Sequence, residues 1–506
     1  MSTQMQSRGK KALLNTSVAM LQEIVGIICA FVIPRLILKT YGSTYNGLIS
    51  SITQFLSCAV LLRAGIGGAT RATLYKPLAQ NDKGKINAIM SATNQFMKRI
   101  AVILAALIII VACIYPLLVS NEFEWFFTFS LFVVIGLSTF AESMFGITPL
   151  ILLQADQQLY IASIFQIVSY LLNVIFSAVL ITRGCSIHLV KLVSAIAFVI
   201  NPIGLHFYVK KRYAVDYHVT PDKNLVSQRW DAFFHQIAAF IMNNSDIIVL
   251  TLFTNMLEVS VYSVYSLIDN GLKKLVMNFT NGLEAAFGNM IATNDDAALR
   301  KSFSMMQFVI FSIATVVYTT TALVILQFVS VYTAGINDVN YIRPAFAYIL
   351  VIGQAFNCVR QPYQLLVQAA GHYKQTKNGA IIEPIVNIIV SIVLLLKFGI
   401  IGVAIGTFVA ILFRTVQYAV YTSKNLLKGT FLSLVKGGVI SVIEAIVAIF
   451  IYKVLPLAKA VNYFGWCLNA LVACVITGII VAVFSSIFYR DTLIGSFNKL
   501  VTLLKK

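Results

Sequence analysis

Charged residues are scarce in this sequence: Asp, Glu, Lys and Arg make up 11% of its 506 residues, and only 19 residues are acidic. The most polar segments, around residues 71–85 and 210–231, are basic and lack paired carboxylates, which argues against a glycosyltransferase or polymerase. No glycine loop of the Walker type and no TVGYG filter string occur, so ATP hydrolysis by that route and a potassium-type channel are disfavoured. The chain therefore gives no sign of being an enzyme.

Metal-ligand patterns are missing as well. The seven cysteines are scattered without a CxxC pair, and all but Cys185 lie in apolar runs, where they act as small apolar side chains. The five histidines lie far apart, without HExxH or any Cys/His ligand spacing. We therefore expect no metal site.

Long apolar runs dominate what is present: 59% of the residues are hydrophobic and the mean hydropathy is +0.85. A bilayer core of roughly 30 Å requires about 20 apolar residues per helix. Backbone groups in lipid must be satisfied within the chain, so these runs are expected to be helices. The sequence predicts an all-α integral membrane protein with about fourteen transmembrane helices, at 12–38, 46–66, 98–119, 124–153, 160–182, 187–209, 232–254, 257–282, 303–331, 341–370, 377–397, 400–422, 433–455 and 463–489.

Basic loop residues indicate the orientation. With the N-terminus inside, 26 Lys and Arg residues fall on the cytoplasmic side and seven on the opposite side. This bias follows the positive-inside rule and predicts that both termini are cytoplasmic. The net charge of +19 is explained by these loops, so we do not expect nucleic-acid binding.

Part of the chain repeats at a fixed offset. Gln154-Ala155, Asn173 and Arg183 recur 214 residues later as Gln368-Ala369, Asn387 and Lys397. An offset of six helices preserves direction, which is typical of two parallel lobes related by an axis along the membrane normal. We expect an N-lobe at 1–211, a C-lobe at 212–431 with a cytoplasmic linker at 210–231, and two additional helices with a basic tail at 432–506. Such lobes favour an alternating-access transporter that binds substrate near the middle of the membrane.

Four stretches of the sequence resemble a known family. The text "IPRLILKTYGSTYNGLISSITQFL", continued by "RAGIGGATRATLYKPLAQNDKGKINAIM", is similar to the polysaccharide transporter family of the multidrug/oligosaccharidyl-lipid/polysaccharide exporter superfamily, and "LLQADQQLYIAS" and "NNSDIIVLTLF" match its later landmarks. The resemblance implies a V-shaped fold of two lobes, like that of multidrug exporters of the same superfamily. It also implies a flippase that moves undecaprenyl-diphosphate-linked oligosaccharide repeat units across the cytoplasmic membrane for O-antigen, capsule or exopolysaccharide. Membrane lipids, a polysaccharide polymerase and other assembly proteins would be its partners.

A diphosphate-linked glycan needs basic groups for its phosphates and polar groups for its sugars. On the first helix, Asn15 and Gln22 share a face with Glu23 at its edge, and we expect this face to line the cavity. Polar contact between helices explains Asn15 and Gln22 equally well. Arg360 and Arg414 lie deep in later helices, where snorkelling to headgroups is difficult.

The eighth expected helix carries two adjacent lysines. Tyr262, Asp269 and Lys273 share one face, and Lys274 lies about 100° away. We expect Lys273 or Lys274 to contact the diphosphate together with Arg360; alternatively, Asp269 pairs with Lys273 one turn away. Asp246, with Glu23, is the candidate for coupling transport to Na⁺ or protons, and no other cofactor is expected.

Two other functions remain open from the sequence. Intramembrane carboxylates also suit a cation-coupled multidrug exporter of the same superfamily. An O-acyltransferase or polymerase of the cell envelope would need a histidine or an acidic pair in a loop, and the acid-poor loops argue against it.

Overall fold

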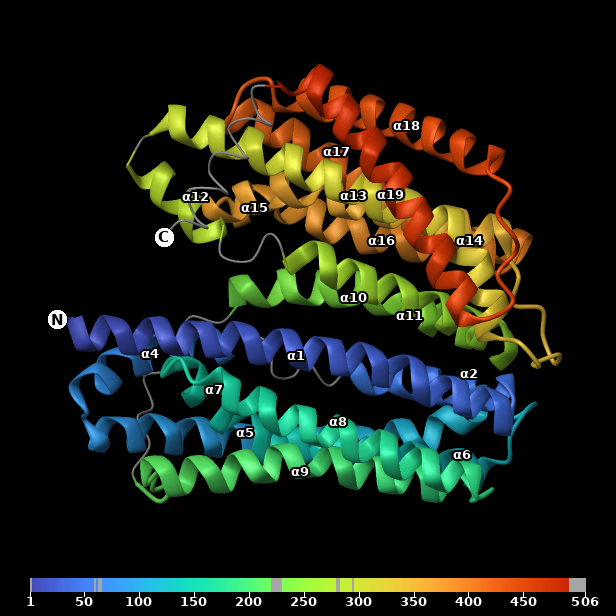
Figure 1. Cartoon of the computed structure of the whole chain (residues 1–506). Coiled ribbons are helices and arrows are strands. Elements are labelled where there is room, and N and C mark those ends of the chain that lie inside the picture. Colours follow the sequence, from blue (N-terminus) through green and yellow to red (C-terminus); the bar gives the residue numbers. More distant parts are fainter. Residues whose placement is uncertain are drawn as a thin grey trace. The chain divides into compact units, whose positions relative to one another are not determined.

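The computed structural model describes residues 2–58, 61, 66–219, 230–278, 283–293 and 295–490. All regular secondary structure in these residues is helical (Figure 1). Twelve of the fourteen expected spans coincide with a helix or with consecutive helices, and those at 46–66 and 257–282 contain residues outside the described ones. Among the described residues, ten spans are long and apolar enough to cross a membrane. The expected linker residues 220–229 and tail residues 491–506 lie outside the described residues.

The chain divides into two compact units. The first comprises residues 1–240 and 254–260, and the second comprises residues 241–253 and 261–506. The first contains α1 (Ser2–Tyr41), α2 (Ser43–Ser57), α4 (Ile66–Gln80), α5 (Lys83–Leu118), α6 (Trp125–Ala141), the π-helical turn η1 (Glu142–Gly146), α7 (Ile147–Ala155), α8 (Leu159–Thr182) and α9 (Ile187–Tyr213). In this unit α8 packs against both α1 and α9.

The basic segment around 71–85, which lies between two expected membrane spans, is largely helical. Residues 66–80 form α4, which packs on α5 and α7, and α5 begins about four turns before the expected membrane span. Asp82 caps α5 by accepting a hydrogen bond from the Lys85 backbone N–H over 3.0 Å, and this bond lowers the pKa of Asp82. Hydropathy identifies the part of a helix that lies in lipid, so it does not reveal where the same helix extends into water.

The second unit contains most of α10 (Trp230–Phe253) and α11 (Met256–Asn278), followed by α12 (Leu283–Ala292), α13 (Asp296–Tyr332), α14 (Pro344–Val359), α15 (Gln361–Ala369), α16 (Tyr373–Phe398), α17 (Ile400–Asn425), α18 (Thr430–Val454) and α19 (Tyr463–Phe488). The helix α16 packs along α17, which also contacts α14, and α13 packs against α14, α18 and α19.

The 214-residue offset extends to backbone geometry. The helices α7 and α15 match residue for residue under this offset, and α8 and α16 both begin at it. The turns between them place Gln157 (φ 56°) and Gly371 (φ 70°) in the left-handed region, which costs a glycine little but strains a glutamine. Inside the helices, Ser177 bonds Asn173 and Ser391 bonds Asn387, both over 3.1 Å. The same local backbone geometry and the same Ser–Asn hydrogen bond therefore occur in both units.

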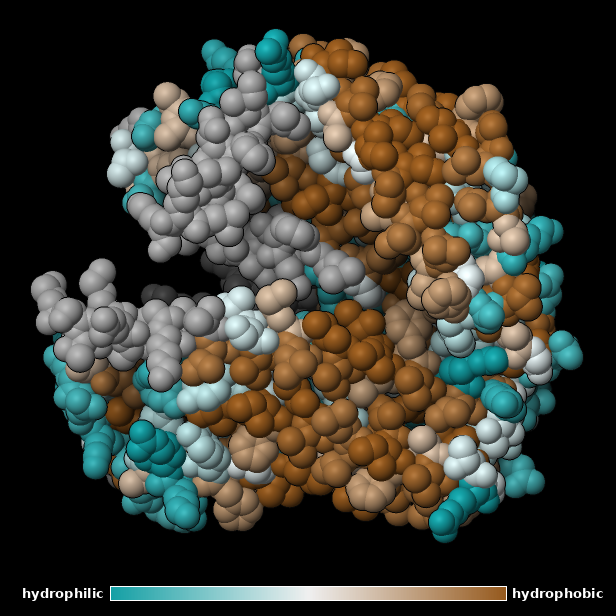
Figure 2. All heavy atoms as spheres, viewed as in Figure 1, coloured by the Kyte–Doolittle hydropathy of each residue, from teal (hydrophilic) through white to brown (hydrophobic). Residues whose placement is uncertain are grey.

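Apolar side chains cover the outer surfaces of the helices. Large hydrophobic residues are exposed along α5, α8, α16, α18 and α19, where a water-soluble protein would bury them. Figure 2 shows brown side chains over most of the visible helical surface, with teal side chains gathered toward its ends. The chain is a multi-pass membrane protein.

Candidate functional site

A helix break places Arg360 inside the second unit. The helix α14 ends at Val359 and α15 begins at Gln361, with Pro362 in its first turn. Proline has no N–H to donate and its ring crowds the carbonyl one turn earlier, so a continuous helix is interrupted here. Arg360 caps both segments, and its guanidinium is largely buried, with 14% of the side chain exposed.

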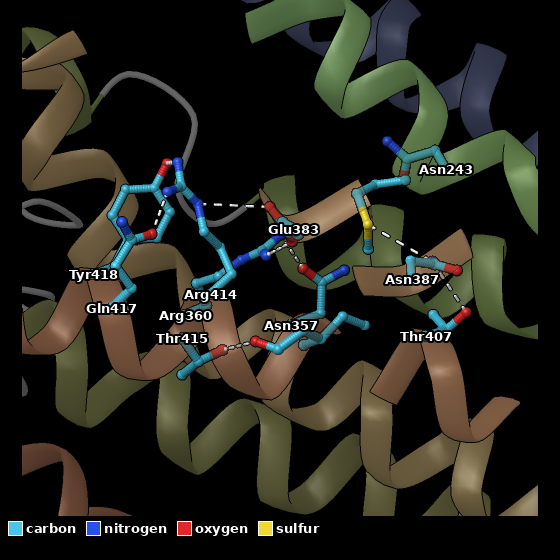
Figure 3. A network of polar contacts seen from close by, with 12 residues as sticks. Asn243, Asn357, Arg360, Glu383, Asn387, Thr407, Arg414, Thr415, Gln417 and Tyr418 are labelled. Atoms are coloured by element: carbon cyan, nitrogen blue, oxygen red, sulfur yellow. Dashed lines mark hydrogen bonds and ion pairs between the residues drawn. The ribbon is translucent and has the colours of Figure 1, made fainter. Parts of the chain in front are cut away.

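The carboxylate of Glu383 lies between two arginines (Figure 3). Its Oε1 pairs with the Arg360 guanidinium, and its Oε2 lies 3.5 Å from Nε of Arg414. Asn357 accepts a second bond from Arg360 over 2.7 Å. Two buried cations thus share one buried anion, which leaves the cluster with one positive charge in excess.

Arg414 is held more completely than Arg360. Only 2% of Arg414 is exposed. Its guanidinium donates to the Thr376 carbonyl over 3.2 Å, to the Tyr418 hydroxyl over 2.7 Å and to the Gln417 side chain. By contrast, Nε of Arg360 is buried and has no hydrogen-bond partner in the described part of the chain. Arg414 therefore positions Glu383, while Arg360 keeps a free donor.

The charged residues of this cluster are not repeated at the matching positions of the first unit. Under the 214-residue offset, Arg360, Glu383 and Arg414 correspond to Gly146, Ser169 and Ile200, which are all neutral. The corresponding helices form and pack in the first unit with neutral residues at these three positions. Since burying charges costs several kcal/mol per ion, the fold itself gives no reason for this cluster.

A second polar cluster surrounds Asp246 on α10. Oδ2 of Asp246 accepts hydrogen bonds from the Tyr262 hydroxyl over 2.6 Å and from the Thr407 hydroxyl over 2.8 Å. Asn387 donates to the Thr407 hydroxyl over 3.3 Å. Oδ1 of Asp246 is buried and has no donor among the described residues. One carboxylate oxygen is therefore left to interact with a cation or to carry a proton.

The lysines of α11 differ in their surroundings. Nζ of Lys273 donates to Oδ1 of Asn243 over 2.8 Å, and Lys273 makes no ion pair with Asp269 within the described residues. Lys274 is exposed. Tyr262 shares the expected helix face with these residues, but its hydroxyl is bonded to Asp246. The hydrogen bond of Lys273 therefore joins α11 to α10.

The candidate residues of α1 lie within the first unit. Asn15 donates to the Gln157 carbonyl over 2.9 Å and accepts from the Tyr160 backbone N–H over 2.8 Å. These bonds join α1 to the turn before α8, which is the helix-contact alternative for Asn15. Gln22 and Glu23 are both partly exposed on the next turns of α1.

Sequence reasoning did not assign a role to Thr407, Asn387 or Glu383 in these clusters. Thr407 lies 161 residues from Asp246. Thr407 and Asn387 are neutral, and their spacing from Asp246 along the chain gives no sign of a contact. Glu383 is visible in the sequence as an acid within an apolar run. A single buried acid requires a basic partner, and this rule could have linked Glu383 to Arg360 and Arg414.

Comparison with solved structures identifies the fold. The chain is similar to the lipid II flippase MurJ in its inward closed conformation, with a TM-score of 0.73 and 16% identity over 95% of this chain and 100% of that chain. It is also similar to an inward-facing multidrug resistance MATE family transporter of the MOP superfamily, with a TM-score of 0.64 and 14% identity over 82% and 98%. The Vibrio cholerae MATE transporter VcmN in its bent form gives a TM-score of 0.56 and 13% identity over 84% and 99%.

No protein-family model matches the sequence, and no curated protein matches it. The identities of the structural matches, all 16% or lower in these three comparisons, concern the fold alone. The chain therefore has the fold shared by the MurJ flippase and MATE transporters.

Proposed function

We propose that this chain translocates isoprenoid-diphosphate-linked oligosaccharides across the cytoplasmic membrane by alternating access, as the resemblance to polysaccharide transporters implies. The similarity in fold to a lipid II flippase over 95% of the chain supports a lipid-linked substrate. The observation that carries the proposal is the excess positive charge of Arg360 and Arg414 around one carboxylate. The cell-envelope polymerase and assembly proteins would then act on the product.

A diphosphate can compete with Glu383 for Arg360. Arg360 keeps one buried donor free at Nε, and guanidinium groups bind phosphate oxygens in a bidentate geometry. Arg414 remains paired with Glu383 during this exchange, because it retains its contacts with Thr376 and Tyr418. The charges then match better than in the free protein, since a second anion offsets the excess cation.

The proposed coupling cation binds at Asp246. Its free Oδ1 and the neighbouring hydroxyl oxygens are hard ligands, which suit Na⁺, and a buried carboxylate equally suits a proton. A cation there neutralises a buried charge and allows α10, α11 and α17 to close around the carboxylate, because Tyr262 and Thr407 come from the last two helices. Cation binding would in this way favour one conformation of the transport cycle.

Transport can be tested with the purified chain in proteoliposomes containing a fluorescent polyprenyl-diphosphate oligosaccharide. We expect the chain to expose the glycan to an impermeant quencher on both leaflets, and Arg360→Gln to abolish this exchange. Arg300→Gln is the matched control, since Arg300 is an exposed arginine bonded to the Lys428 carbonyl. Equal exchange by Arg360→Gln and the parent chain would exclude the phosphate role of Arg360.

The alternative is export of organic cations. The similarity to MATE transporters and the buried carboxylate of Asp246 favour it. In cells, deletion of the gene separates the two functions. Loss of surface polysaccharide with lipid-linked repeat units retained on the cytoplasmic face supports the flippase, whereas normal polysaccharide with increased sensitivity to cationic dyes supports drug export.

A further inference from the structure

A polar cavity of about 320 Å³ lies among α13, α18 and α19, away from the Glu383 and Asp246 clusters. Its lining is rich in hydroxyl and amide groups although it sits between apolar helices; the polar members are Ser304, Gln307, Ser312, Ser433, Ser441 and Ser485. A space of this volume with several polar walls holds water readily. The proposed transport of a glycan gives this cavity no role.

The carboxylate of Glu444 lies at the inner part of this cavity. Glu444 is 4% exposed and stands about midway along α18, on the same face as Gly437, Ile440 and Ser441. Within the described residues it makes no hydrogen bond or ion pair. An acid without a partner at this depth is costly in a membrane and marks a functional position.

The outer part of the cavity is basic. Lys436 and Arg490 are both exposed, and Nζ of Lys436 lies 5.5 Å from the ring centre of Tyr489. Eight residues separate Lys436 from Glu444, or about 12 Å along the helix axis. The cavity thus runs from a basic entrance to an acidic floor, and the predicted topology places the entrance at the cytoplasmic side.

Charge at the entrance selects the ligand. Among the described residues, the titratable and charged groups that line the cavity with Glu444 are Lys436 of α18 and Tyr489 and Arg490 at the end of α19. The described lining residues from α13 are uncharged, and none of the described lining residues comes from α17. Two positive side chains repel Na⁺ and organic cations, as basic residues do in selective pores. A proton can still pass, because it moves along water and hydroxyl groups without crossing as a hydrated ion.

We propose that Glu444 is a proton-binding site at the floor of a water-filled cavity, separate from the coupling site at Asp246. Protonation removes the charge of Glu444 from the floor, so the packing of α18 and α19 on α13 becomes responsive to pH on the side where the cavity opens. This places a proton sensor on the two helices that follow the internal repeat.

Reaction with dicyclohexylcarbodiimide tests the protonated state in the full-length parent chain. This lipid-soluble reagent adds to a carboxylic acid and rearranges to a stable N-acylurea where water is limited. We expect mass spectrometry to locate the adduct on Glu444 at low pH, and its rate to fall about tenfold per pH unit once the group is mostly ionised. Glu444→Asp should still react, and the exposed loop residue Glu124 should not. Absence of the adduct at every pH would overturn the proposal.

Cysteine accessibility tests the water-filled path. In a chain whose native cysteines are replaced by serine, we expect Ser441→Cys to react with an anionic methanethiosulfonate several-fold faster than with a cationic one. Replacing Lys436 and Arg490 with Gln should remove this preference. Val442→Cys is the matched control, since Val442 is 57% exposed on the lipid-facing side of the same turn and should react slowly with both reagents. If Ser441→Cys reacts no faster than Val442→Cys, the cavity holds no continuous water and the proposal fails.

Discussion

Tyr262 donates its hydroxyl to Oδ2 of Asp246 over 2.6 Å, so α11 holds one oxygen of a carboxylate carried by α10. The other oxygen, Oδ1, stays buried without a donor in the described part of the chain. This asymmetry separates an oxygen that is fixed by the protein from one that is left for a cation.

The first prediction concerns that free oxygen. Asp246→Asn should abolish the dependence of transport on Na⁺ or on pH, because an amide neither binds a proton at this position nor neutralises a cation. Transport measured in proteoliposomes at varied Na⁺ and pH decides the point. Asp216→Asn, at an exposed acid in the loop after α9, serves as the control and should retain the dependence. An Asp246→Asn variant that still follows the cation gradient would remove Asp246 from coupling.

The second prediction concerns the stability of the Glu383 cluster. Glu383→Gln leaves two buried arginines without a counterion, and breaking a buried ion pair costs about 3–5 kcal/mol. We expect a large fall in the thermal unfolding temperature of the purified protein. Adding Arg414→Met should restore part of the loss, since it removes one uncompensated charge. Additive losses in the double variant would show that Arg414 and Glu383 do not stabilise each other.

The third prediction concerns the lysines of α11. Replacing both Lys273 and Lys274 with Gln should abolish surface polysaccharide while the protein stays inserted at normal abundance. The change removes the positive charges that would attract an anionic substrate. The same change at Lys210 and Lys211 gives a matched control, since these adjacent lysines are exposed at the end of α9. Full polysaccharide in the Lys273/Lys274 variant would take α11 out of the substrate path.

The fourth prediction uses the internal repeat. Asn173→Ala and Asn387→Ala each remove a side-chain acceptor of a buried serine hydroxyl, which costs about 1–3 kcal/mol of stability. Asn387 also donates to Thr407 beside Asp246, so its variant should lose cation dependence as well. Thermal unfolding and transport measured on both variants separate the shared structural role from the added one. Loss of cation dependence in Asn173→Ala would contradict this division.

The fifth prediction concerns topology. A cysteine introduced at Asn121, in the exposed turn after α5, should react in intact cells with an impermeant thiol reagent. A cysteine at Asp216 should react only after the cells are permeabilised, because the loop bias places this segment and both termini in the cytoplasm. The opposite pattern would reverse the orientation.

The apolar runs of the sequence are sufficient to assign this protein to the helical membrane proteins. Backbone groups in lipid must form hydrogen bonds within each apolar run, so the run at 160–182 predicts α8 closely. The repeat of Gln154 and Asn173 at an offset of 214 residues predicts the shared geometry of α7 and α15. Buried charge in an apolar run also marked Arg360, Arg414 and Asp246 without any structural information.

The partners of these charges become visible when the packing of the helices is known. Glu383 meets Arg414 across α16 and α17, and Thr407 reaches Asp246 from 161 residues away, through packing that no local pattern encodes. Spacing along α11 allowed Asp269 to pair with Lys273, but the Lys273 ammonium donates a hydrogen bond to Asn243 on a neighbouring helix. Helical periodicity determines which residues share a face; the packing of helices determines what that face contacts, because hydrogen bonds and ion pairs depend on distances between segments far apart in the chain.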